Sequence, residues 1–238
     1  MSKHANRSHQ TGRTEPLLPR DDRPRVLITG ACRGVGRACA EALVRCGTEL
    51  ILCDNDAGSL SETTKELGAV GRFCDVASEA SVAVFAADIL EQFETLDMVI
   101  NAAGGGYERT LGMYRVSRAL LPALRRGTHN NLLLNIPPEE KDADAAIFPY
   151  ASSEQAFHRL SAALAAETRG TAISVLIGDP ISRRVSQVLP DPDAGSLAET
   201  CELRRGEGAA IGAFASQIAS LIDAPNPSAS LGRRRAAG

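Results

Sequence analysis

The sequence predicts an α/β fold, a doubly wound parallel sheet of about six or seven strands with helices on both faces. Three observations favour this class. Short aliphatic runs alternate with helical patterns along the 238 residues. A glycine-rich loop stands directly between the first of these runs and the first helical pattern. Runs such as Val26-Leu27-Ile28 are apolar at every position, as expected for strands that are covered on both faces.

The strand candidates are short segments rich in Val, Ile and Leu that are bounded by turn residues. In chain order they are residues 25–29, 49–53, 71–74, 97–101, 131–136 and 172–177. Because strands that alternate with helices form right-handed βαβ units, we expect these segments to lie parallel in one sheet.

Helical spacing fills the gaps between the strand candidates. The first helix places apolar residues close to the i, i+4, i+7, i+8 pattern, at Val35, Cys39, Ala42, Leu43 and Cys46. It ends at Gly47, which suits the residue after the C-cap. A later helix buries Phe157 and stops at Gly170, and a last helix is expected over residues 208–222.

A single domain is expected over residues 25–223, with disordered tails at residues 1–24 and 224–238. The first tail has few large apolar residues, and the second is rich in proline and small residues before its arginine run. Neither can bury enough apolar surface to offset the loss of conformational entropy. A domain of about 200 residues needs no disulfide or metal to be stable.

Composition argues against several partners. The net charge of −3 and the absence of Trp give no reason to expect a nucleic-acid partner. No stretch approaches the roughly 18 consecutive apolar residues of a membrane span, and the N-terminus has no apolar signal-peptide core. We therefore expect neither nucleic acid nor membrane as a partner.

The six cysteines form no CxxC pair. Only His129 and His158 lie outside the first tail, so no metal site is expected. We interpret the four evenly spaced cysteines from Cys32 to Cys53 as small buried residues. Free thiols without a disulfide framework favour a reducing, cytoplasmic location.

The loop Thr29-Gly30-Ala31-Cys32-Arg33-Gly34-Val35-Gly36 follows the first strand and opens the first helix. Glycines in this context permit a tight turn and the close approach of a pyrophosphate to the helix N-terminus. Asp54 ends the second strand, where a carboxylate accepts hydrogen bonds from ribose hydroxyls and repels a 2′-phosphate. This favours NAD over NADP as cofactor, although Arg33 could meet a 2′-phosphate.

These residues resemble the short-chain dehydrogenase/reductase family, which has a Rossmann-like fold. Thr29 to Gly36 is similar to its TGxxxGxG motif, Asp75-Val76 to its adenine-contacting segment, and Asn101-Ala102-Ala103-Gly104 to its NNAG motif. Residues 120–124 and 173–182 are similar to its fourth-helix ending and its nicotinamide turn. The cofactor-binding residues that the resemblance implies are Gly30, Cys32, Arg33, Gly34, Val35, Gly36, Asp54, Asp75, Val76, Asn101, Ala102, Gly104 and Pro180.

The resemblance also implies a catalytic set of Asn, Ser, Tyr and Lys, and this chain departs from it. Tyr150 stands at the Tyr position, but Glu154 stands where Lys is expected, Pro138 at the Ser position and Arg109 near the Asn position. A phenol titrates near about 10 and needs a nearby cation to work at neutral pH, which a carboxylate one helical turn away does not supply. Pro138 offers no hydroxyl.

No other constellation replaces that set convincingly. His158 lies two turns beyond Tyr150, Glu154 would need desolvation to act as a base, and Ser152 and Ser153 have no His in obvious reach. The shortness of the segment between Gly104 and Arg109 indicates a reduced substrate pocket, or one completed by another chain.

Three functional interpretations remain. The first is an NAD(H)-binding family member without the usual Ser and Lys, inactive or non-standard, with a regulatory or structural role. The second is an active NAD(P)-dependent oxidoreductase that uses Tyr150 on a small carbonyl or alcohol. The third is a protein-interaction module with a vestigial cofactor pocket. The resemblance implies a homodimer or higher oligomer through helices over residues 111–126 and 150–169, and a hetero-partner stays open.

Overall fold

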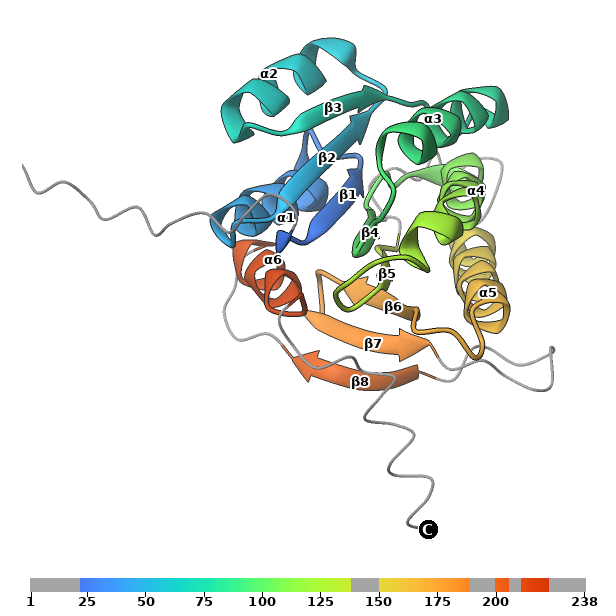
Figure 1. Cartoon of the computed structure of the whole chain (residues 1–238). Coiled ribbons are helices and arrows are strands. Elements are labelled where there is room, and N and C mark those ends of the chain that lie inside the picture. The colour runs from blue at the N-terminus through green and yellow to red at the C-terminus, as the bar shows by residue number, and fades with distance from the viewer. Residues whose placement is uncertain (1–21, 138–149, 189–199, 206–210, 223–238) are drawn as a thin grey trace, which may run out of the picture.

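The computed structural model describes residues 22–137, 150–188, 200–205 and 211–222. Within these residues one mixed sheet has the strand order β3-β2-β1-β4-β5-β6-β7-β8 (Figure 1). The strands are β1 (Arg25–Thr29), β2 (Glu49–Asp54), β3 (Val70–Phe73), β4 (Met98–Asn101), β5 (Leu132–Asn135), β6 (Ser174–Asp179), β7 (Arg184–Val188) and β8 (Thr200–Arg205). The helices are α1 (Gly34–Arg45), α2 (Ala57–Leu67), α3 (Glu79–Gln92), α4 (Gly106–Leu124), α5 (Tyr150–Glu167) and α6 (Ile211–Ala219).

The predicted doubly wound class is confirmed, and the six predicted strands correspond to β1 through β6, which pair in parallel. The described sheet has one feature that the sequence did not indicate. β7 and β8 extend the sheet as antiparallel strands beyond β6. The helix expected over residues 208–222 is α6, within its described part.

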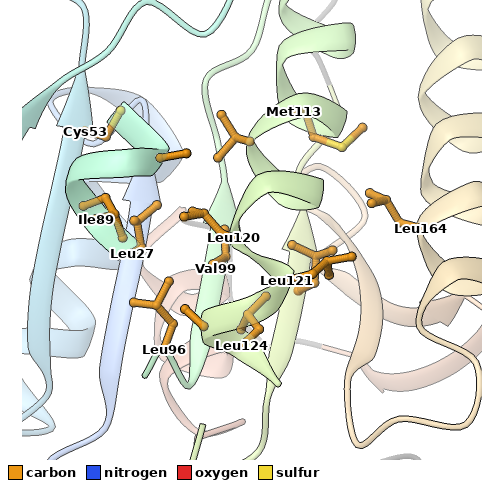
Figure 2. Packing of buried hydrophobic residues seen from close by; sticks show 14 of the residues in the cluster. Leu27, Cys53, Ile89, Leu96, Val99, Met113, Leu120, Leu121, Leu124 and Leu164 are labelled. Carbon is orange, nitrogen blue, oxygen red and sulfur yellow. The ribbon is translucent and has the colours of Figure 1, made fainter. Parts of the chain in front are cut away.

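Helices cover both faces of the sheet, and the side chains of β1 show how the core divides. Val26 and Ile28 belong to a buried cluster with residues of α1 and α6, whereas Leu27 belongs to a second cluster with residues of α3, α4 and α5. Figure 2 shows Leu27 and Val99 of the sheet facing Leu120 of α4. This alternation is what a strand covered on both faces requires.

Side-chain caps explain where two of the helices begin. The carboxylate of Asp56 accepts hydrogen bonds from the N–H groups of Gly58 and Ser59 and so begins α2, and the hydroxyl of Ser78 accepts one from Ser81 at the start of α3. The N-cap of α1, Arg33, has no side-chain cap. The first N–H groups of α1 are therefore left for another acceptor.

The chain reverses its direction of winding between β1 and β4, which are neighbours although β2 and β3 separate them in sequence. In open α/β sheets, ligands bind at such a switch point, beyond the carboxyl ends of the strands. None of the described helices is long and apolar enough to cross a membrane. The tails predicted at residues 1–24 and 224–238 lie almost entirely outside the described residues and stay predictions.

Candidate functional site

A cavity of about 520 Å³ lies at the carboxyl ends of five neighbouring strands. It is lined by residues that directly follow β1, β2, β3, β4 and β5, together with the start of α1 and one residue of α4. The lining residues are Gly30, Arg33, Gly34, Val35, Asp54, Asn55, Asp75, Val76, Ala102, Ala103, Gly104, Arg109, Ile136 and Pro137. The cavity therefore spans the switch point between β1 and β4.

The glycine loop is shaped by close backbone contacts. Gly30 has a φ of +64°, and a Cβ there would lie 2.7 Å from the Cα of Ala103. A Cβ on Gly36 would lie 2.2 Å from the carbonyl oxygen of Gly30. Only glycine satisfies both contacts, so the loop holds α1 tightly against the β1 and β4 ends.

The start of α1 is suited to an anion. Gly34 has a φ of +55°, lines the cavity, and would have no atom within 4 Å of an added Cβ. A ligand can thus approach this backbone closely. Because α1 has no side-chain cap, its first N–H groups and its dipole favour a phosphate at this point.

Asp54 ends β2 with its side chain toward the loop. One carboxylate oxygen accepts a hydrogen bond from the N–H of Cys32 at 3.1 Å, and the other accepts one from the N–H of Asp56 at 3.2 Å. Each oxygen keeps a lone pair for a further donor. The guanidinium of Arg33 lies 3.9 Å from Asp54, and the Arg33 side chain is 74% exposed.

Asp75 follows β3 and organises its own turn. Its carboxylate accepts a hydrogen bond from the N–H of Ala77 at 3.1 Å, and its N–H donates to the hydroxyl of Ser81 at 3.0 Å. Asp75 and the buried Val76 line the same end of the cavity as Asp54. This end therefore combines two carboxylates with one apolar side chain.

Of the residues assigned to the cofactor from sequence, four do not line the described cavity: Cys32, Gly36, Asn101 and Pro180. Two of these four still shape the site. The N–H of Cys32 donates a hydrogen bond to Asp54, and the backbone of Gly36 lies close to the carbonyl oxygen of Gly30. Pro180 follows β6.

Asn101 is 3% exposed and lies in the interior. Its amide nitrogen donates to the hydroxyl of Ser117 at 2.8 Å and to the side-chain oxygen of Asn135 at 2.9 Å. Asn135 in turn donates to Ser161 at 3.2 Å. In this structure Asn101 thus joins β4 to β5 and α4 rather than facing the cavity.

The structure adds lining residues that were not assigned to the cofactor: Asn55, Ala103, Arg109, Ile136 and Pro137. Four of them directly follow a strand that was correctly predicted, so the rule that ligands bind at strand ends could have found them. Arg109 lies in the first turns of α4, and its position in the cavity depends on where that helix begins.

For the predicted proton-transfer set, the structure describes only part. Tyr150 is the first residue of α5, and Glu154 lies one turn further along the same helix with an exposed side chain. The orientation of the Tyr150 side chain and all of Pro138 lie outside the described residues. In the described part of the chain no group of three His, Cys, Asp or Glu residues could hold a metal ion.

The switch-point cavity, the glycine loop and the uncapped start of α1 define a nucleotide-binding, doubly wound α/β protein. The family model described as short chain dehydrogenase matches residues 24–181. The chain belongs to the short-chain dehydrogenase family.

Two named relatives illustrate the similarity. The chain is 30% identical over 224 residues to L-fucose dehydrogenase of Oryctolagus cuniculus, covering 82% of this chain and 78% of the relative. It is 29% identical over 197 residues to the rhamnolipids biosynthesis 3-oxoacyl-[acyl-carrier-protein] reductase of Pseudomonas aeruginosa, covering 71% and 77%.

Solved structures agree with this assignment. The Pseudomonas aeruginosa RhlG complex with NADP has a TM-score of 0.58 and 26% identity, covering 66% of this chain and 70% of that one. A Burkholderia phymatum family member in complex with NAD has a TM-score of 0.56 and 26% identity, covering 66% and 65%. Similar proteins are thus solved with either cofactor.

Proposed function

We propose that this protein binds a nicotinamide dinucleotide, NAD(H) in preference to NADP(H), as a non-standard or inactive family member with a regulatory or structural role. The observation that carries the proposal is the cavity at the switch point between β1 and β4. It combines a glycine cradle, an uncapped helix start and a carboxylate at the end of β2.

The described residues fit such a ligand in an extended arrangement. The N–H groups at Gly34 and Val35 would bind the pyrophosphate, Asp54 the hydroxyls of the adenosine ribose, and Val76 the adenine. The β4 segment from Ala102 to Gly104 would then contact the nicotinamide half. When bound, the nicotinamide ring supplies or accepts a hydride.

The preference for NAD(H) rests on Asp54. The Asp54 side chain is 4% exposed, and its carboxylate accepts hydrogen bonds from two backbone N–H groups, so it is held in place and keeps lone pairs for further donors. A 2′-phosphate at this point would meet that negative charge. Arg33 opposes the preference, but its side chain is 74% exposed, so solvent screens its charge and makes it the weaker influence.

The inactive or non-standard role in this proposal is supported by the residues of α5. Glu154 lies four residues after Tyr150, where the family has Lys, and it faces solvent. A carboxylate at this spacing cannot stabilise a phenolate on Tyr150 and repels it weakly. Without a cation at position 154, the Tyr150 phenol lacks the neighbouring group that would make it a better proton donor at neutral pH.

A second candidate is an active oxidoreductase on a small carbonyl or alcohol. It is favoured by the names of the similar proteins, which are dehydrogenases and reductases. In that case Tyr150, at the start of α5, would give a proton to the substrate oxygen or take one from it. The Tyr150→Phe variant keeps the ring and removes that proton.

Fluorescence titration of the purified full chain with NADH, with NADPH in parallel, tests the first proposal. Saturable binding with NADH the tighter ligand is expected. Binding of neither nucleotide would contradict both candidates and leave a protein-interaction module with a vestigial pocket. If NADH binds, a screen of carbonyls and alcohols followed at the nicotinamide absorbance separates the candidates, and turnover abolished by Tyr150→Phe would establish the second.

A further inference from the structure

Arg109 brings a positive charge to the β4–β5 end of the cavity. One of its guanidinium nitrogens, Nη1, donates a hydrogen bond of 2.7 Å to the carbonyl oxygen of Gly104. This contact ties the side chain to the segment that follows β4, and Arg109 lines the cavity there. No described carboxylate lies within 4.0 Å of its guanidinium, so its charge is not compensated by a described residue.

The cavity is therefore polarised along its length. Two carboxylates, Asp54 and Asp75, and one cation, Arg33, line the end beside β2 and β3. Arg109, Ile136 and Pro137 line the end beside β4 and β5, where the cation has no carboxylate in the lining. The strand order puts these two ends on opposite sides of the glycine loop. A nucleotide whose ribose hydroxyls meet Asp54 would extend toward Arg109 with its other half.

The chemistry of a guanidinium decides what fits beside it. Arg109 has five N–H donors, and the bond to Gly104 uses one of them. The remaining donors form a planar fork that matches the two oxygens of a carboxylate. Ile136 and Pro137 offer apolar contact for a short carbon chain at the same place.

We propose that Arg109 binds the carboxylate of a small oxo- or hydroxy-carboxylic acid in the β4–β5 half of the cavity. The inference rests on the proposed function, because the second ligand would lie beside the nicotinamide half of the bound dinucleotide. It adds the chemical class of that ligand, and it holds whether the ligand is converted or only sensed.

The test compares two probes of the same shape that differ in charge, pyruvate and its amide pyruvamide. Isothermal titration calorimetry of the full chain measures each probe with NADH and without it. We expect wild-type protein to bind pyruvate about ten-fold more tightly than pyruvamide, as a charge-assisted hydrogen bond predicts. Arg109→Gln should remove the difference, and Arg109→Lys should keep part of it because the charge stays and the fork is lost.

The matched control is Arg118→Gln on the same helix, where Arg118 pairs with Glu167 at 3.3 Å and does not line the cavity. It should leave pyruvate binding unchanged. Equal affinity of wild-type protein for the two probes would overturn the inference. An Arg109→Gln variant that still prefers pyruvate to pyruvamide but binds NADH more weakly would overturn it as well. Failure of wild-type protein to bind NADH would instead contradict the proposed function, and the titration without NADH would still decide the role of Arg109.

Discussion

The carboxylate of Asp54 and the N–H of Cys32 are joined by a hydrogen bond of 3.1 Å. This bond fastens the end of β2 to the middle of the glycine loop. The residue expected to read the ribose therefore also holds the loop that would receive the pyrophosphate. Substitutions at Asp54 report on both roles, which can be separated because one concerns the choice of nucleotide and the other the shape of the loop.

Asp54→Ala should weaken NADH binding by about ten- to a hundred-fold, since hydrogen bonds to a charged group contribute about 1.5–3 kcal/mol. It should also relieve the discrimination against NADPH, because the charge that repels a 2′-phosphate is gone while Arg33 remains. Parallel fluorescence titrations measure both affinities. An unchanged ratio of the two would show that Asp54 does not select the nucleotide.

Asp56→Asn is the matched control for that experiment. Asp56 is also an acid near the end of β2, but it caps α2 and does not line the cavity. Asparagine is as good an N-cap as aspartate, so neither stability nor nucleotide choice should change.

Gly36→Ala should prevent nucleotide binding and lower the free energy of unfolding by about 1–3 kcal/mol. The added Cβ would stand 2.2 Å from the carbonyl oxygen of Gly30, which is a backbone atom, so the loop or the helix would have to shift. Urea unfolding and NADH titration measure the two effects. Gly58→Ala in α2 is the control, because the added Cβ would lie 3.5 Å from the nearest atom, which is an ordinary contact. Alanine favours a helix more than glycine does, so this variant should be slightly more stable.

The first six strands could be predicted because each is an aliphatic run that is buried on both faces. The antiparallel pair β7 and β8 could not. The turn that leads into β7 has Arg183 at a φ of 56°, a conformation that glycine or asparagine usually marks. β7 itself buries the polar Gln187 next to Val188, so its sequence shows neither an apolar run nor an alternation.

The candidate site was predictable where its residues are neighbours in sequence. The glycine loop and Asp54 follow from a local pattern at the end of a strand. Asn101 was assigned to the cofactor for the same reason, yet in this structure it bonds Ser117 and Asn135, because the packing of α4 on β4 brings a hydroxyl to it. The exposed Arg109 lines the cavity because α4 begins soon after the end of β4, a placement that no local pattern reveals.

Cys32 gives a prediction for the dependence on pH. Burial and then the negative charge of Asp54 raise the pKa of the Cys32 thiol from 9.0 to about 11. At pH 8 its thiolate fraction, and hence its rate of alkylation by iodoacetamide, should be about a hundred-fold below that of an ordinary thiol. The rate should rise with pH up to about 11, and peptide mass spectrometry resolves it from that of the exposed Cys46.

The Asp54→Asn variant tests the cause. Removing the carboxylate charge should lower the pKa of Cys32 and speed its alkylation at pH 8, while Cys46 reacts as before. A Cys32 that reacts as fast as Cys46 in wild-type protein at pH 8 would contradict the burial and the contact with Asp54.

Ser117→Ala should destabilise the fold by about 1–3 kcal/mol, because it removes a partner from a buried amide. The Ser117 hydroxyl accepts from Asn101 at 2.8 Å and donates to the carbonyl oxygen of Met113 at 2.7 Å, and the residue is fully buried. Urea unfolding measures the loss. Ser216→Ala is the control, since the exposed Ser216 hydroxyl makes the same kind of bond to Gly212 at 2.9 Å, and its removal should cost less than about 0.5 kcal/mol. Equal costs for the two variants would mean that the Asn101–Ser117 bond adds nothing to stability.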